Sequence, residues 1–249
     1  MNGMGNRFIA AGYTDPKWKI QVSGKMIIEH VCDLFPGETD FTFLINEEHE
    51  QEANVREILS SLRPGCKIIT VPYRKKGPVP AMLEAHEVEA YIEDDEPYMV
   101  SYCDYGGGWD WGGFKKKMIA GDYDGGIPCY TGFHPPLIRP GVYGGCLVDE
   151  NNDLLEMREK HSFTEDKTQS HHAAGMYYFK SGKIMKEYCE RCMAEVEPIS
   201  NGEWYTSMPY YLMQEDGLKT HVFEMDKFFQ WGTPLDLKDY EYWEEVFRK

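Results

Sequence analysis

The sequence predicts an α/β fold whose sheet is mostly parallel. Up to residue 104, short apolar runs typical of buried strands alternate with helical segments, and Pro-Gly or Gly-Pro pairs separate them. The run Phe41-Thr42-Phe43-Leu44-Ile45 is nearly all apolar, as in strands that are covered on both faces. Strands that alternate with helices across short turns form parallel sheets with right-handed crossovers.

The first half of the chain supplies this alternation. Apolar residues at helical spacing between Met26 and Leu34 predict an amphipathic helix, and Pro36-Gly37 ends it. Pro64-Gly65 closes the next helix in the same way. In order, the expected elements are a short extended segment at 20–22, a helix at 25–34, a strand at 41–45, a helix at 50–62, a strand at 66–71, a helix at 80–92 and a strand at 97–103.

After Asp104 the pattern changes. Gly106-Gly107-Gly108 predicts a flexible turn, and Thr164 to Gln169 predicts a polar loop. No internal repeat or long linker is visible, so the second half is expected to form a smaller mixed α/β lid continuous with the sheet. Its expected elements are helices at 111–120, 181–195, 203–214 and 234–247, and strands at 126–131, 142–148, 154–159, 174–180 and 220–225.

The charge of the chain limits its partners. The 249 residues carry a formal net charge of −16 and a pI near 4.9. Binding to nucleic acid or to an anionic membrane needs a basic field, so neither partner is expected. A phosphate ligand would instead need local cations and a divalent metal.

The cysteines point to a reducing compartment. Their number, seven, is odd, and they form no framework of regular spacings. No apolar run reaches the roughly 20 residues of a membrane span, and no secretory leader is visible, so a cytoplasmic location is expected. Cys189 and Cys192 form one close pair, better explained as two thiols on neighbouring turns of a helix than as a zinc or redox site.

The opening stretch has the composition of a polyphosphate site. Gly3-x-Gly5-x-Arg7 places two side-chain-free positions before a guanidinium, and Pro16-Lys17 adds a second cation. Glycine lets backbone N–H groups approach an anion, and arginine binds phosphate oxygens in pairs. Glycine pairs also mark ordinary turns. Such a loop normally follows a buried strand, but only Met1 and Asn2 precede Gly3, so the first strand of the sheet is expected to be truncated.

Two further sites follow strands of the first half. Asp104 comes at the carboxyl end of the strand at 97–103, where open α/β sheets bind ligands, and its carboxylate suits Mg²⁺. The alternative is a turn aspartate that caps the glycine-rich loop. At 77–81, Gly77 would let a nucleotide base lie against the backbone, although Gly-Pro also begins ordinary helices.

The second half offers weaker candidates. Lys160, after Glu159, could meet a substrate phosphate, although most such pairs are surface ion pairs. Tyr130, in the segment up to His134, could contact a sugar or simply end a strand. His171 and His172 lack the spacing and a third ligand for a metal site.

Taken in order, these segments resemble the sugar-1-phosphate nucleotidyltransferases of the bacterial pyrophosphorylase-like family, and most closely its capsule-biosynthesis branch. The opening is similar to that branch's A-G-x-G-S-R-F, A-G-Y and P-K motifs, and further matches span nearly the whole chain. The matching residues are Asn2-Gly3-Met4-Gly5-Asn6-Arg7-Phe8, Ala11-Gly12-Tyr13, Pro16-Lys17, Gly24-Lys25-Met26-Ile27, residues 77–81, Tyr102-Cys103-Asp104, Glu159-Lys160, Ala174-Gly175-x-Tyr177, Asn201-Gly202-Glu203-x-Tyr205 and Trp231-Gly232-Thr233-Pro234-x-Asp236.

The resemblance implies a Rossmann-like three-layer α/β/α core in one domain, 1–249, with a nucleotide-binding part at 1–124 and an acceptor-binding part at 125–249. It implies that an NTP binds first, that a phosphate oxygen of a sugar 1-phosphate or similar molecule attacks the α-phosphorus in line, and that pyrophosphate leaves. It also implies a cytoplasmic enzyme of surface-polysaccharide precursor synthesis that forms dimers or tetramers.

The resemblance also assigns residues. Arg7 would hold the β- and γ-phosphates, Lys17 would neutralise charge at the α-phosphate, and Asp104 would hold Mg²⁺. The nucleotide-binding residues would be Gly3, Met4, Gly5, Asn6, Gly77, Pro78 and Ala81. The substrate-binding residues would be Tyr130, Gly144, Glu159, Lys160, Gly175 and Tyr205, with Lys160 placing the attacking phosphate.

One departure from the family keeps other functions open. Gln230 stands where the family usually has a second metal-binding aspartate. A GT-A-type glycosyltransferase would share the nucleotide-binding sheet and use Asp104 with Asp110 in place of a tight DxD motif. A non-catalytic nucleotide-binding relative would account for Gln230 and for the short start.

Overall fold

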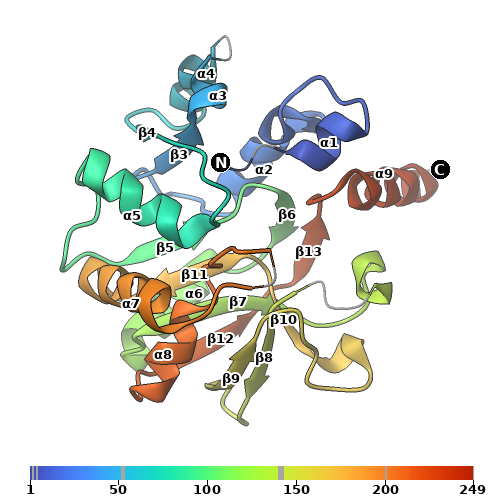
Figure 1. Cartoon of the computed structure of the whole chain (residues 1–249). Coiled ribbons are helices and arrows are strands. Elements are labelled where there is room, and N and C mark those ends of the chain that lie inside the picture. Colours follow the sequence, from blue (N-terminus) through green and yellow to red (C-terminus); the bar gives the residue numbers. More distant parts are fainter. Residues whose placement is uncertain (2, 4, 52–53, 140–142, 200, 249) are drawn as a thin grey trace.

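The computed structural model describes all residues except 2, 4, 52–53, 140–142, 200 and 249 (Figure 1). Its helices are α1 (Asn6–Ala10), α2 (Ile27–Asp33), α3 (Glu47–Gln51), α4 (Val55–Leu62), α5 (Pro78–Val88), α6 (Trp111–Gly121), α7 (Gly182–Glu195), α8 (Pro209–Glu215) and α9 (Pro234–Arg248), with 3₁₀ turns η1 (Lys17–Lys19), η2 (Pro135–Ile138) and η3 (Lys167–Gln169). Its strands are β1 (Gln21–Val22), β2 (Lys25–Met26), β3 (Thr42–Asn46), β4 (Lys67–Val71), β5 (Tyr98–Ser101), β6 (Tyr105–Gly108), β7 (Gly125–Tyr130), β8 (Gly145–Val148), β9 (Leu154–Arg158), β10 (His171–Ala173), β11 (Met176–Phe179), β12 (Thr220–Glu224) and β13 (Lys227–Gln230).

The central sheet is mixed, and most of its strand pairs are antiparallel. Its seven strands run in the order β5-β11-β7-β10-β8-β9, with β12 added beside β7. Only the β12–β7 pair in this sheet is parallel. The expectation of a mostly parallel sheet is therefore wrong. Parallel neighbours need a long crossover, usually a helix, whereas β8 joins its antiparallel neighbour β9 through a short connection, and β10 and β11 both pair antiparallel with β7.

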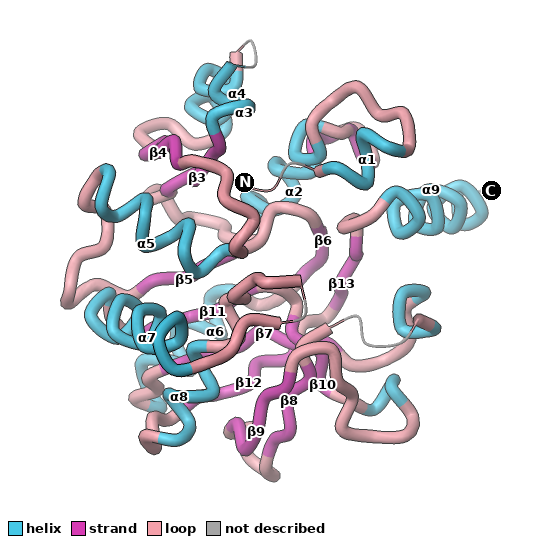
Figure 2. Tube along the Cα trace, in the orientation of Figure 1, coloured by secondary structure: helices cyan, strands magenta, loops and turns pink. Residues whose placement is uncertain are grey.

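The predicted parallel unit does form in the first half. β3 and β4 pair in parallel from Thr42↔Lys67 to Asn46↔Val71, and α4 lies in the crossover between them. The predicted single helix at 50–62 is two shorter helices, α3 and α4. Helices and connecting loops surround the strands, as Figure 2 shows by colour.

The three glycines after Asp104 form a strand and not a flexible turn. β6 pairs antiparallel with β13, with Gly106 opposite Phe229. A Cβ atom on Gly106 would lie 2.3 Å from the Trp231 ring, and one on Gly107 would lie 2.4 Å from the Lys227 carbonyl oxygen. Glycine is present here because other groups pack directly on the backbone.

A small core cluster ties the two ends of the chain together. Phe8 of α1, Trp231 after β13 and Leu237 of α9 are all almost completely buried in it. α1 and α9 accordingly lie on the same side of the molecule in Figure 1. This packing holds the start of the chain beside the end of β13.

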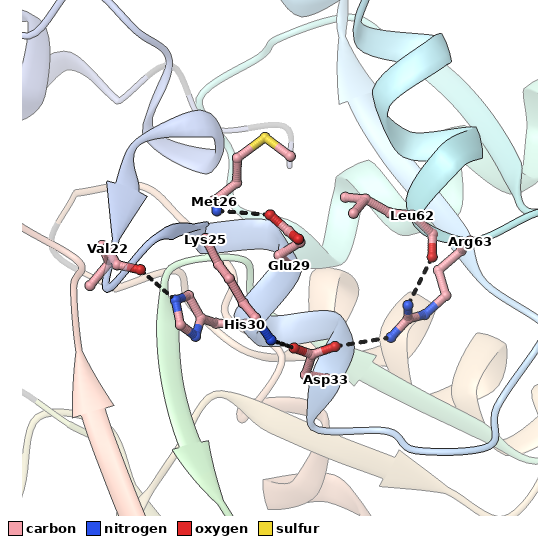
Figure 3. A network of polar contacts seen from close by, with 8 residues as sticks. All are labelled: Val22, Lys25, Met26, Glu29, His30, Asp33, Leu62 and Arg63. Carbon is pink, nitrogen blue, oxygen red and sulfur yellow. Dashed lines mark hydrogen bonds and ion pairs between the residues drawn. The ribbon is translucent and has the colours of Figure 1, made fainter.

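Polar contacts around α2 fix the segment that follows the opening loop (Figure 3). The His30 ring donates to the Val22 carbonyl (2.8 Å), and the Met26 N–H donates to the Glu29 carboxylate (3.0 Å). Asp33 pairs with Lys25 (2.7 Å) and with Arg63 at the end of α4 (3.8 Å). These contacts join the β1–β2 hairpin to α2 and α2 to α4.

Among the described residues, no helix is both long and apolar enough to cross a membrane.

Candidate functional site

A large cleft opens between the first-half elements and the central sheet. Its volume is about 910 Å³. It is lined by most of the predicted nucleotide-binding residues, by Lys17, by the predicted metal ligand Asp104 and by one predicted substrate-binding residue, Tyr205. These residues are Gly3, Gly5, Lys17, Gly77, Pro78, Ala81, Asp104 and Tyr205.

At one end of the cleft Lys17 forms an ion pair with Asp104. Lys17 begins the η1 turn after Pro16, and Asp104 lies in the connection from β5 to β6. Their side chains keep 20% and 26% of their exposed area, so both remain accessible from the cleft. Lys17 also lies against Gly5, whose backbone φ of +64° favours glycine. The opening loop, the lysine and the carboxylate thus form one local group.

Gln230 lies near Asp104. The β13–β6 register sets Gln230 opposite Tyr105, and the Trp231 N–H donates to the Asp104 carbonyl (3.1 Å). A Cβ atom on Gly232 would lie 2.5 Å from Gln230 Nε2 and 3.4 Å from Asp104 Oδ2, so both side chains lie against this glycine. Gly232 was not predicted as a site residue, although it lies in the Trp231-Gly232-Thr233 segment that resembles the family.

This pair of side chains suits magnesium. Mg²⁺ is often held by one or two carboxylates, with water and substrate phosphates completing the octahedron. Asp104 supplies one carboxylate, and the Gln230 amide can supply a neutral oxygen. No cluster of three or more His, Cys, Asp or Glu side chains with metal-ligand geometry occurs among the described residues. Asp104 and Gln230 would leave the other positions of the octahedron to water and substrate oxygens.

Arg7 and Asn6 lie outside this group. Both are exposed residues of α1 and neither lines the cleft, and Arg7 has no ion pair with another described residue. Phe8, the next residue, is buried and holds α1 in place. Met4 lies outside the described residues.

The Gly77 turn is built by packing against a later loop. Gly77 has φ +93°, and a Cβ atom there would lie 2.5 Å from the Trp204 carbonyl oxygen. The Trp204 N–H donates to the Lys76 carbonyl (2.9 Å), and the Val79 N–H donates to the Trp204 carbonyl (3.3 Å). α5 begins immediately afterwards at Pro78, so the turn both starts a helix and carries the loop that brings Tyr205 to the cleft.

Glu159 occupies a separate polar position at the end of β9. Its carboxylate accepts a hydrogen bond from Ser207, and its N–H donates to the Tyr211 hydroxyl (3.1 Å). A Cβ atom on Gly144 would lie 3.0 Å from Glu159 Oε1, so these two predicted residues are neighbours. Glu159 lines a second pocket of about 620 Å³ and not the large cleft.

Tyr102 lies between the cleft and the segment Thr206-Ser207 that contacts Glu159. It lines the cleft, and its hydroxyl accepts from the Thr206 N–H (3.3 Å). Gly175, at φ +85°, lies against its ring: a Cβ atom there would be 3.0 Å away. Burial raises the pKa of the Tyr102 hydroxyl above its usual range, and the nearby Glu159 carboxylate adds to the shift. Lys160 is exposed.

Tyr130 is buried in an aromatic cluster, with only 3% of its surface exposed. Its hydroxyl lies 2.6 Å from His134 Nε2, and its ring stacks on Phe228 at 4.6 Å. His172 is also buried, and its Nε2 donates to the Lys167 carbonyl. These side chains pack the sheet, so neither a solvent-facing strand end nor a sugar contact describes Tyr130 in this structure.

Asp110 and the close cysteine pair have structural roles. Asp110 caps α6 by accepting from the Gly113 N–H (2.8 Å), and it does not line the cleft. Cys189 and Cys192 are free thiols buried on α7, and burial raises the pKa of Cys192 to about 12. A buried thiol with a raised pKa is neither a nucleophile nor a metal ligand at neutral pH.

Glu159→Gln is expected to change the pH dependence of stability. Burial, the largest cause, raises the pKa of Glu159, and the hydrogen bond from Ser207 opposes it. The folded protein therefore holds this proton more tightly than the unfolded chain does. The resulting stability is complete below the unfolded-state pKa and is lost as the pH rises through the folded-state pKa.

Glutamine keeps an acceptor for Ser207 but cannot ionise. Thermal unfolding should therefore give matching Tm values for E159Q and the native chain at about pH 4, and a higher Tm for E159Q at about pH 8. The exposed Glu165 provides the control, because Glu165→Gln should leave both values unchanged. A lower Tm for E159Q at the higher pH would contradict the burial argument.

Solved structures with a similar fold include nucleotidyltransferases and pyrophosphorylases. The chain matches the nucleoside-diphosphate-sugar pyrophosphorylase from Vibrio cholerae RC9 with a TM-score of 0.75 and 19% identity, over 96% of this chain and 97% of that one. It matches the inositol-1-phosphate CTP transferase from T. maritima with a TM-score of 0.67 and 15% identity, over 96% of this chain and 91% of that one.

A third match is a UDP-glucose pyrophosphorylase complexed with UDP-glucose, with a TM-score of 0.69 and 16% identity over 98% of this chain and 96% of that one. Comparison with protein-family models and with curated proteins finds no match. At these identities the likeness concerns the backbone arrangement. The chain therefore has the mixed α/β fold that sugar nucleotidyltransferases and pyrophosphorylases share.

Proposed function

We propose that this protein is a nucleotidyltransferase that moves an NMP group from an NTP to a phosphorylated small molecule and releases pyrophosphate. The observation that carries the proposal is the group formed by Gly3, Gly5, Lys17 and Asp104 at one end of the cleft. It combines accessible backbone, a cation and a metal-binding carboxylate, which is what a triphosphate requires.

In this proposal residues 1–124 bind the nucleotide. The backbone at Gly3 and Gly5 cradles phosphates, Lys17 neutralises charge at the α-phosphate, and Asp104 and Gln230 hold Mg²⁺. When bound, Mg²⁺ would supply neutralisation of the triphosphate charge. Arg7, exposed on α1, would reach the β- and γ-phosphates of a triphosphate that extends past Gly5.

Residues 125–249 would bind the acceptor. Tyr205 and Tyr102 line the cleft. Gly175 lies against the Tyr102 ring, and Gly144 lies against the Glu159 carboxylate. The exposed Lys160 would place the attacking phosphate, which is already ionised, so the reaction needs positioning and charge stabilisation and no general base.

The finer assignment rests on the sequence resemblance. It names a sugar 1-phosphate as acceptor, surface-polysaccharide precursor synthesis as the purpose, the cytoplasm as the location and a homo-oligomer as the assembly. The solved matches act on related molecules: one is an inositol-1-phosphate CTP transferase and one was complexed with UDP-glucose.

The GT-A-type alternative loses its second carboxylate, because Asp110 caps α6 outside the cleft. A non-catalytic nucleotide-binding relative is favoured by the neutral Gln230 near Asp104. Pyrophosphate release by the protein would distinguish the nucleotidyltransferase from this non-catalytic relative.

The proposal predicts that Lys17→Met removes activity while Lys19→Met does not. The protein would be incubated with Mg²⁺, each of the common NTPs and a panel of sugar 1-phosphates and phosphocholine, and pyrophosphate release would be measured. With the active pair, K17M should lower kcat/KM by about 10²- to 10³-fold. Lys19 is the matched control, because it lies on the same η1 turn, its side chain pairs with the exposed Asp15 (3.9 Å), and it does not line the cleft. Equal activities for the two variants, or no pyrophosphate from any pair, would refute the assignment.

A further inference from the structure

The turn between β13 and α9, residues 230–233, is fixed at both of its ends. At the first end, the Trp231 N–H donates to the Asp104 carbonyl (3.1 Å). At the second end, the Thr233 hydroxyl donates to Asp236 Oδ2 (2.7 Å), and the Asp236 N–H donates back to the same hydroxyl oxygen (3.2 Å). We call these four residues the β13–α9 turn. Its position relative to Asp104 therefore depends on how firmly Asp236 is held.

Asp236 is a buried carboxylate with both oxygens engaged. Its second oxygen, Oδ1, pairs with Arg139 Nη2. The Asp236 side chain is 3% exposed and the Arg139 side chain is 35% exposed, so the guanidinium covers the acid from the surface. A helix cap needs one oxygen of the acid, and the ion pair fixes the other. Such a buried pair adds little net stability but can fix one arrangement of its neighbours.

Arg139 is itself held by a second loop. It comes directly after η2, and Lys167 Nζ of η3 donates to the Leu137 and Arg139 carbonyls (3.1 Å each). The Gly132 N–H also donates to the Thr168 carbonyl (2.7 Å). The η2 and η3 segments thus form one support from which the Arg139 side chain reaches α9.

We propose that Arg139 is a positioning residue for the metal position. Through Asp236 and Thr233 it holds the β13–α9 turn so that Gln230 stays near Asp104. Arg139 does not line the large cleft, so it acts through the turn and not on a substrate. The proposal rests on the proposed function where it assigns a metal to Asp104 and Gln230, whereas the hold on the turn is independent of that function.

The test compares three variants of the full chain. Arg139→Met removes the charge, and Arg139→Lys keeps it. Arg191→Met is the matched control, because Arg191 on α7 is similarly exposed (31%) and also pairs with an aspartate, Asp216. If R139M does not fold, R139M/D236N replaces it, because that pair leaves no unpaired charge in the interior.

Amide hydrogen exchange at Trp231 is the direct readout, because this N–H makes the hydrogen bond to Asp104. R139M should speed its exchange by at least about tenfold. R139K should stay closer to the native rate, and R191M should leave the rate unchanged. The Val222 N–H of β12, bonded to the Asn152 carbonyl (2.8 Å), reports on the central sheet. Unchanged exchange at Trp231 in R139M, or equal acceleration at Trp231 and Val222, would overturn the proposal.

The second readout is the magnesium requirement with an active substrate pair. R139M should need at least about tenfold more Mg²⁺ for half its maximal rate, with KM for the acceptor unchanged. Faster exchange at Trp231 with an unchanged magnesium requirement would also overturn the proposal. If no substrate pair releases pyrophosphate, the proposed function and the metal role fail together, and exchange at Trp231 still decides whether Arg139 holds the turn.

Discussion

Asp104→Asn is expected to lower metal-dependent pyrophosphate release by about 10²- to 10³-fold, as large a loss as that expected for Lys17→Met. Asparagine keeps the size of the side chain but removes the charge that would hold Mg²⁺ and that pairs with Lys17. The measurement is kcat/KM across a magnesium titration with the active substrate pair. The variant should also need more Mg²⁺ to reach half its maximal rate, because the neutral Gln230 alone remains beside the site.

The Tm of the D104N variant shows whether its loss of activity is catalytic or results from unfolding. Loss of the partly exposed ion pair should cost only about 1 kcal/mol, which lowers Tm by about 2–4 °C in a chain of this size. Asp110→Asn is the control within the same segment, because Asp110 caps α6 and does not line the cleft. Full activity in D104N at saturating Mg²⁺ would contradict a metal role for Asp104.

The double variant tests whether Lys17 and Asp104 act together. Each single change leaves the partner without its opposite charge, so the effects of D104N and K17M should not add. The double variant should therefore be close in kcat/KM to the worse single variant. Additive losses would mean that the two groups act on separate parts of the reaction.

Local sequence patterns predicted the elements better than their arrangement. The apolar run at 41–45 and the strand at 126–131 lie within one residue of β3 and β7, because burial of apolar side chains decides where such strands form. The direction of pairing in the central sheet was predicted wrongly. It depends on which distant strands meet, such as β11 with β5, and no local pattern records that.

The candidate site likewise combines positions that local patterns predict with positions that distant contacts determine. Lys17, Asp104, Gly5 and Gly77 meet in the cleft because they lie where strands and turns end, which the sequence marks with glycine and proline. Arg7 could not be placed in this way. Its orientation is set by the burial of Phe8 against Trp231, a contact between opposite ends of the chain.

Gly106 shows how a distant contact changes the meaning of a local pattern. Three successive glycines predict flexibility, yet Trp231, 1% exposed, packs its ring on Gly106, and the end of β13 reaches Asp104 through that contact. Gly106→Ala should therefore lower the free energy of unfolding by about 3 kcal/mol, because the added methyl overlaps a ring that is buried and has no room to move.

Gly108→Ala is the matched control in the same strand. A Cβ atom on Gly108 would meet no other atom within 4 Å, so the substitution should be neutral or stabilise by up to about 1 kcal/mol. Urea unfolding of the two variants gives the comparison, and magnesium-dependent activity gives a second one. G106A should lose activity as well as stability, since any shift of Trp231 moves Gln230 and Gly232 relative to Asp104. Equal stability of the two variants would mean that β13 is not fixed through Trp231, and the position of Gln230 would then need another cause.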